Sequence, residues 1–248
     1  MILDTSRRRT RSDGERSRRA ILEASARLAT VEGLRGLTIG GLAAATGKSK
    51  SGLYAHFGSK EELQLATIDA ANEIFQAEVV VPATASGGPI EQIIELSDRF
   101  LEYVGSDVFP GGCFFAAASA ELDTHPGRVR ERIAAFQAGW MQRFMELVAA
   151  AQTTGDIDER EDPMQLGFEL NSMLSLANSI YVMFGDRSAF DRARLGIRQR
   201  LGLEPGSSQR ESNRPRPALS GKAQSGSYAR FGRSQRSVVR RSSPFRRE

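Results

Sequence analysis

The sequence has little of several features on which common protein architectures depend. A single cysteine, Cys113, among 248 residues excludes an internal disulfide framework and fits a reducing cytoplasm. The longest uncharged run, residues 170–185, is too short and too often interrupted by Asn and Ser to span a bilayer. Arginines near the N-terminus are followed by no apolar stretch, so a secretory signal is not expected. We therefore expect a cytoplasmic globular protein.

Patterns typical of enzymes and metal sites are also missing. The run 47–49 (Gly-Lys-Ser) ends like a phosphate-binding loop, but five residues instead of four separate it from Gly41, and a helical pattern precedes it. His56 and His125 lie far apart, with no Cys or acidic cluster at ligand spacing. The acids of residues 156–162 lack the glycine and the spacing of a calcium loop. The sequence therefore predicts neither catalysis nor a cofactor or metal.

A strong local pattern is present in residues 38–57, TIGGLAAATGKSKSGLYAHF, which divide into two short helices joined by a glycine break. Thr38 and Ser49 stand where N-caps are expected, and Gly47 leaves the right-handed region at low cost. Apolar residues four apart turn one side of the second helix inward and leave polar side chains outside. This is the helix-turn-helix arrangement that places a helix in the major groove, and an ordinary helical hairpin is the alternative.

Around this motif, over about residues 15–65, the chain resembles the TetR family of one-component transcriptional regulators. The matching residues are Ile21-Leu22-Glu23-Ala24, Leu28-Ala29, Glu32-Gly33, Leu37-Thr38-Ile39, Leu42-Ala43, Ala45-Thr46-Gly47, Ser49-Lys50, Leu53-Tyr54-Ala55-His56-Phe57 and Lys60-Glu61-Glu62-Leu63. Two departures do not break the pattern. Lys48 replaces a small apolar residue in the turn and would add a phosphate contact. Gly40-Gly41 weakens the first motif helix by up to about 1 kcal/mol per glycine.

The resemblance and the exposed positions of the second helix together predict how DNA is contacted. We expect Lys50, Ser51 and Tyr54 to face base edges or adjacent phosphates. We expect Lys48, His56 and Lys60 to hold the DNA backbone, helped by arginines of the preceding helix (Arg16, Arg18 or Arg19). The predicted DNA-binding residues are Thr38, Lys48, Ser49, Lys50, Ser51, Gly52, Tyr54, His56 and Lys60.

The rest of the chain shows helical periodicity and no strand alternation, which predicts an all-α fold of about nine helices, with an N-terminal three-helix helix-turn-helix domain and a C-terminal helical ligand-binding and dimerisation domain. Residues 60–81 read as one long connecting helix, broken by Pro82 and the run 83–89. The predicted organisation is a basic disordered arm (1–14), a DNA-binding domain (15–62), an effector-binding and dimerisation domain (63–203) and a disordered basic tail (204–248).

Charge separates the ends of the chain from its middle. Residues 1–20 carry seven arginines against three acids, and residues 204–248 carry eleven basic against three acidic residues, whereas the part between has an acidic excess. An arginine-bearing arm before the motif is well placed to enter the minor groove, and a solvated terminus is an equal alternative. The tail lacks apolar periodicity, and its arginines would add sequence-independent DNA affinity or nothing specific.

The predicted effector-binding and dimerisation domain, residues 63–203, is called the second block below, and its sequence predicts a sensor and a dimer surface. Residues 170–185 carry no charge over about four helical turns, so this helix is buried on more than one side. The resemblance implies that the last two long helices pair with their copies in a homodimer, which presents two recognition helices about 34 Å apart to a palindromic operator. An apolar pocket would suit a small hydrophobic effector, with core packing as the alternative for each residue. The predicted ligand-binding residues are Phe100, Tyr103, Cys113, Phe114, Phe136, Trp140, Phe144, Asn171, Met173 and Asn178.

The sequence thus predicts a sequence-specific DNA-binding transcriptional regulator of the TetR type, a repressor released by its ligand. Its partners would be double-stranded DNA, the effector and a second copy of the chain. Cys113 opens a predicted helix whose dipole would lower its pKa, so a thiol sensor is one interpretation and a small buried side chain the other. The alternative function is a helical small-molecule or thiol-sensing protein that acts without DNA.

Overall fold

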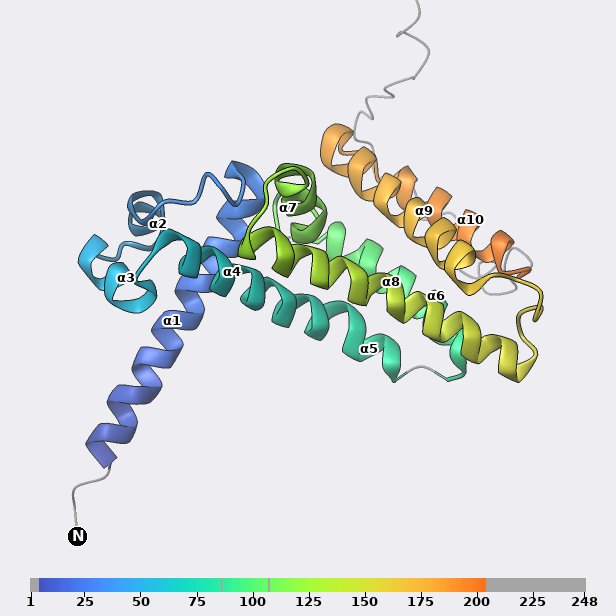
Figure 1. Ribbon diagram of the computed structural model, residues 1–248, viewed down its shortest axis with the longest axis horizontal. Helices are drawn as coiled ribbons and strands as arrows, with labels where there is room; N and C mark the ends of the chain where they lie inside the picture. Colours follow the sequence, from blue (N-terminus) through green and yellow to red (C-terminus); the bar gives the residue numbers. More distant parts are fainter. Residues whose placement is uncertain (1–4, 86, 107, 204–248) are drawn as a thin grey trace, which may run out of the picture. The chain divides into compact units, whose positions relative to one another are not determined.

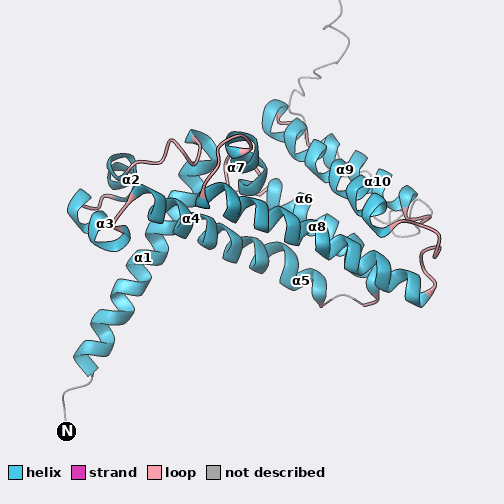
Figure 2. Cartoon of the chain, in the orientation of Figure 1, coloured by secondary structure: helices cyan, strands magenta, loops and turns pink. Residues whose placement is uncertain are grey.

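Helices make up all the regular structure in the computed structural model, which describes residues 5–85, 87–106 and 108–203. Figure 2 shows helices and loops and no strand in this part of the chain, so the predicted all-α fold is confirmed. The α-helices (Figure 1) are α1 (Thr5–Glu32), α2 (Ile39–Thr46), α3 (Lys50–Phe57), α4 (Lys60–Phe75), α5 (Val81–Thr84), α6 (Pro89–Val104), α7 (Phe114–Leu122), α8 (Arg128–Thr154), α9 (Pro163–Phe184) and α10 (Ser188–Arg200). Within the described ranges, no helix has both the length and the apolar character needed to cross a membrane.

The connecting helix is longer than the sequence predicts. A π-helical segment, η1 (Gln76–Val80), joins α4 to α5, so the chain runs on helically from residue 60 to 84. If α4, η1 and α5 are counted as one continuous helix, the described residues form the predicted nine helices. Pro82 was expected to end the helix, but it lies in the first turn of α5, where its missing N–H costs little. The break instead precedes Gly88, the N-cap of α6.

The N-terminal arm also differs from the prediction. Helix α1 begins at Thr5, so most of the stretch 1–14 that was expected to be disordered is helical. Residues 5–32 contain no proline, and their Arg, Ser, Glu and Ala residues are compatible with a helix, so nothing stops α1 from extending backwards. The predicted disordered tail, residues 204–248, lies outside the described residues.

A small apolar core holds the N-terminal helices together. Leu53 and Phe57 of α3 are buried in it, at 0% and 6% exposure, as their spacing predicts. Because these two residues anchor one side of α3, its opposite side faces away from the protein. The full core consists of Ile21, Leu22, Ile39, Leu42, Ala43, Leu53, Phe57 and Leu63.

A second, larger core lies among α4 and α6–α10, and its centre is the ring of Phe75. Phe75 is 1% exposed. Edge-to-face contacts surround it, with ring centroids 5.1–6.4 Å away, which is the favoured arrangement of aromatic pairs. Its partners are Phe100, Tyr103, Phe115, Phe136 and Trp140. Since Leu63 at the start of α4 belongs to the first core, one continuous helix is packed into both cores.

Candidate nucleic-acid interface

Hydroxyl caps and a left-handed glycine shape the two helices of the motif. The Gly41 amide donates to Thr38 Oγ1 (2.9 Å) at the start of α2, and the Gly52 amide donates to Ser49 Oγ (3.1 Å) at the start of α3. Gly47 ends α2 with φ +64°, a conformation that a side chain would disfavour. The predicted caps and break therefore form, and they set the direction in which α3 leaves the turn.

The outer side of α3 is exposed and free of negative charge. Tyr54 is 56% exposed, and Lys50 and Ser51 lie on the same side of the helix. Residues 33–59 contain no Asp or Glu, so no carboxylate of this segment repels a phosphate. Of the nine predicted contact residues, Gly52 is half-buried and the other eight are exposed: Thr38, Lys48, Ser49, Lys50, Ser51, Tyr54, His56 and Lys60.

Several of these polar groups already have partners inside the protein. The hydroxyls of Thr38 and Ser49 serve as caps, and Lys60 Nζ donates to the carbonyl of Arg35 (2.5 Å). In α1, the Arg18 guanidinium lies 5.1 Å from the centre of the Phe57 ring, and Arg19 pairs with Glu23. Lys48, Lys50 and Tyr54 carry no such bond to other described residues. Their polar groups are therefore available for contacts outside the protein, and contact with DNA stays a prediction.

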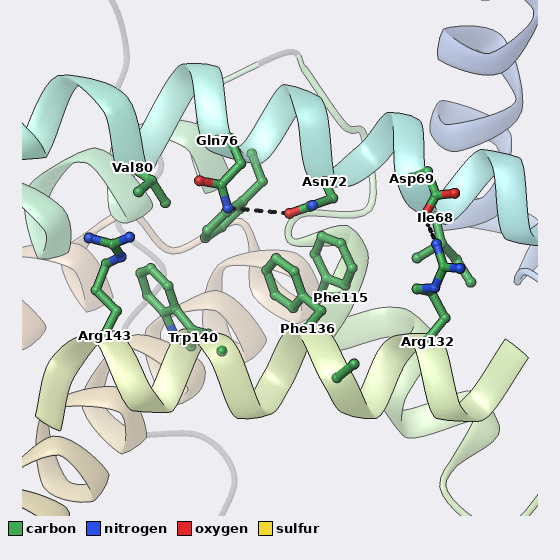
Figure 3. A pocket seen from close by; sticks show the side chains of 13 residues that line it. Ile68, Asp69, Asn72, Gln76, Val80, Phe115, Arg132, Phe136, Trp140 and Arg143 are labelled. Atoms are coloured by element: carbon green, nitrogen blue, oxygen red, sulfur yellow. Dashed lines mark hydrogen bonds and ion pairs between the residues drawn. The ribbon is translucent and has the colours of Figure 1, made fainter. Parts of the chain in front are cut away.

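The second block contains a groove between α4 and α8 with a volume of about 430 Å³ (Figure 3). Phe136 and Trp140, two of the ten predicted ligand-binding residues, line it. Neither spacing nor hydropathy singled out its polar lining residues, which are Asp69, Asn72, Gln76, Arg132 and Arg143. The other eight predicted residues lie elsewhere in the block: Phe100, Tyr103, Cys113, Phe114, Phe144 and Asn178 are buried, and Asn171 and Met173 are half-buried.

Comparison with known proteins agrees with this geometry. Residues 21–67 match the model described as bacterial regulatory proteins, tetR family, and residues 89–197 match the tetracyclin repressor-like C-terminal domain. The chain belongs to the TetR family. It is therefore a DNA-binding transcriptional regulator by family, and the family is one of regulators rather than enzymes.

Several solved structures share the fold, and among them are other TetR regulators. One from Chloroflexus aurantiacus J-10-FL is 26% identical with a TM-score of 0.72, over 77% of this chain and 96% of that one. One from Streptomyces coelicolor is 22% identical with a TM-score of 0.65, over 75% of this chain and 95% of that one. AibR, solved with isovaleryl coenzyme A and operator DNA, is 22% identical with a TM-score of 0.56, over 76% of this chain and 98% of its own. No curated protein sequence matches the chain at a significant level.

Two asparagines of this TetR-family chain, both predicted as ligand contacts, hold other parts of the block. Trp140 Nε1 donates to Asn171 Oδ1 (2.8 Å), which ties α8 to α9. The amide of Cys113 donates to Asn178 Oδ1 (2.9 Å), which ties the start of α7 to α9. Both amide groups thereby satisfy buried or half-buried N–H donors, a role that sequence spacing could not distinguish from ligand binding.

Contacts that the sequence did not predict join the DNA-binding helices to the second block. The Glu121 carboxylate, near the end of α7, accepts hydrogen bonds from the amides of Leu34 (2.6 Å) and Arg35 (2.8 Å) in the turn after α1. Gly111 lies against the carbonyl of Thr30, where an added Cβ would come within 2.0 Å of the oxygen. The turn that leads into the motif is therefore held directly by α7, and the end of α1 before that turn is held by the loop before α7.

The Cys113 thiol has the opposite character to a sensor. Burial raises its pKa to about 11, and this effect exceeds the lowering by the backbone amides of Ala116 and Phe115. The helix start lowers the pKa of the thiol, as predicted, but burial away from solvent raises it by more.

We predict that native Cys113 resists iodoacetamide near neutral pH, because only the thiolate reacts and this thiol is both buried and protonated. Alkylation followed by mass spectrometry should show a modified cysteine only after unfolding in guanidinium, or as the pH approaches the raised pKa. The unfolded chain at the same neutral pH is the control. Rapid modification of the folded protein at neutral pH would contradict the assignment of Cys113 as a buried, unreactive side chain.

Proposed function

We propose that this TetR-family regulator is a homodimeric repressor that leaves a palindromic operator when a small molecule binds its second block. The main support for the proposal is the exposed side of α3, which has no acidic residue. Lys50, Ser51 and Tyr54 face outward there, while the opposite side of the helix is buried in the small core. Lys50 and Tyr54 then read base edges, and Lys48 and His56 hold phosphates. Such a protein works where the chromosome lies, in the cytoplasm.

The two-domain division proposed here follows the two apolar cores only in part. Residues 15–62 form the DNA-binding domain and residues 63–203 form the effector-binding and dimerisation domain. The small core supports the proposed DNA-binding domain, although Leu63, the residue after its end, also belongs to that core. The C-terminal half of α1 packs with the second core through Ala26 and Ala29, so the domains share this helix as well as α4.

The dimer surface is proposed on α9 and α10. Met164, Phe168 and Leu176 of α9 follow one another at intervals of one and two helical turns, and Met183 continues the same side. A row of exposed large apolar side chains in one protomer is typical of a protein interface. The exposed fractions range from 46% to 74% for Met164, Phe168, Leu176, Val182, Met183, Phe184 and Leu195.

The connecting helix supplies a route from effector to DNA. Because α4 is packed in both cores, a ligand that shifts it relative to α8 also moves the support of α3. In a dimer such a movement takes the two recognition helices out of register with their half-sites. The ligand moves this equilibrium only by its differential affinity for the two states, typically about 1–3 kcal/mol. AibR, captured with both isovaleryl coenzyme A and operator DNA, shows that a related fold accommodates both kinds of partner.

We predict that Tyr54→Ala weakens binding to the operator by about 10- to 100-fold, the range expected for one lost base contact. Tyr54 is exposed, so the substitution should leave folding and dimerisation unchanged. Gel shift with the chain's own upstream DNA and with an unrelated duplex, at one stated salt concentration, measures the effect. Lys48→Ala is the contrasting variant, since loss of a phosphate contact weakens both duplexes alike and lowers the salt slope by about 1. Unchanged operator affinity of Tyr54→Ala would remove α3 from the DNA contact.

A further inference from the structure

The groove between α4 and α8 has two ends of different character (Figure 3). At one end Arg132 is paired with Asp69, so its charge is balanced within the protein. At the other end lies Arg143, which is half-buried, and within the described part of the chain no carboxylate or hydrogen-bond acceptor contacts its guanidinium. Figure 3 shows Arg143 rising from α8 toward Val80, with Trp140 beside it.

The middle of the groove is aromatic on one side and amide-lined on the other. Phe136 and Trp140 come from α8, and Phe115 lies nearly parallel to Phe136, with 5° between the ring planes. Across from them, Asn72 Oδ1 accepts a hydrogen bond from Gln76 Nε2 (3.3 Å). Phe136 is half-buried and Trp140 keeps 7% exposure, so these two rings, rather than the fully buried Phe115, offer apolar surface to a ligand body.

The π-helical segment η1 contributes directly to this groove. Gln76 and Val80, its first and last residues, are both lining residues. π-helical segments are rare, and those inserted in α-helices occur frequently at functional sites. The irregular part of the connecting helix therefore lies at the groove, next to the Arg143 guanidinium, which has no partner among the described residues.

We propose that the groove binds a small organic acid, with its carboxylate on Arg143 and its apolar body against Trp140 and Phe136. A partly buried cation without a partner is unfavourable, and a carboxylate matches the guanidinium fork with two parallel hydrogen bonds. A cationic ligand has no such site, because Asp69, the acid among the lining residues, is already paired. The volume of about 430 Å³ suits a compact molecule. That the acid acts as the effector rests on the proposed function, whereas binding of the acid in the groove does not.

Trp140 is the only tryptophan of the chain, so its fluorescence reports on the groove. The test titrates the full chain, without DNA, with 3-phenylpropionate, 2-naphthoate and cyclohexanecarboxylate, each against its neutral amide. Calorimetry measures the same pairs independently of any absorbance by the probe. We expect at least one acid to bind about tenfold or more tightly than its amide, as loss of a charge-assisted pair predicts.

Variants place the effect on one side chain. Arg143→Gln should lower the affinity for the acid to that for the amide, whereas Arg130→Gln, on the same helix but outside the groove, should change neither. Equal binding of acid and amide in all three pairs, no binding at millimolar concentration, or an acid preference that survives in Arg143→Gln would overturn the inference. A gel shift separates this result from the proposed function. If an acid binds but does not release the operator, the acid site is supported and release by that ligand is contradicted. If the protein binds its operator but binds none of the acids, the acid site is refuted and the proposed DNA-binding function stands.

Discussion

The double substitution Leu176→Glu with Met183→Glu is expected to convert the protein into a folded monomer. In one protomer these side chains are 61% and 74% exposed, so charges there cost the monomer little. In a symmetric dimer each substitution occurs twice at the same interface. Desolvating an unpaired carboxylate costs several kcal/mol, so the dimer dissociation constant should rise by about a thousandfold or more. Sedimentation velocity over a concentration series measures the change.

The control for this pair is Val81→Glu, which places one such charge on an apolar residue of α5 that is 61% exposed, as Leu176 is. It should sediment as the wild type does. Circular dichroism should show unchanged helix content in both variants, and the monomeric variant should lose most operator affinity because one recognition helix reaches only one half-site. A double variant that still sediments as a dimer would place the interface away from this side of α9.

Phe75→Ala is expected to lower the free energy of unfolding by about 3–5 kcal/mol, the range measured for large aromatic truncations in cores. The ring is 1% exposed, and its five aromatic neighbours come from α6, α7 and α8, so the cavity cannot close by movement of one side chain. Urea unfolding at one fixed protein concentration provides the comparison, since a dimer's stability depends on concentration.

Tyr54→Ala is the control for that measurement, because it also removes an aromatic ring but from an exposed position. Its stability should stay within about 0.5 kcal/mol of the wild type. If Phe75→Ala cost no more than this control, Phe75 would not be the centre of the second core. Loss of the Phe75 ring should also weaken operator binding at temperatures where Phe75→Ala remains folded. The reason is that α4, which connects the two cores, is then less tightly packed in the second one.

The DNA-binding motif could be predicted because its signals are local. The Thr38 and Ser49 caps, the left-handed Gly47 and the inward Leu53 depend on neighbours within one helical turn, and the structure has all of them. The connecting helix was predicted too, but its end was not. Proline normally breaks a helix, and only the π segment before Pro82 shows why this one does not.

The groove of the second block was less predictable, because its lining depends on which helices pack against each other. Phe144 and Trp140 have the same apolar character in the sequence, yet Phe144 is fully buried and Trp140 lines the groove. The role of Glu121 could not be predicted, because the sequence around it does not show that its carboxylate accepts hydrogen bonds from backbone amides more than eighty residues away. Arg143 likewise became a candidate only once its lack of a partner among the described residues could be seen.

Selection from a pool of random duplexes tests most directly whether α3 reads DNA as part of a dimer. The wild-type chain, at physiological ionic strength, should enrich an inverted repeat whose half-sites are centred about one helical turn, or a small multiple of it, apart. The Tyr54→Ala variant should enrich that repeat much less. A pool that emerges without any enriched sequence, or one enriched equally by both proteins, would contradict the account.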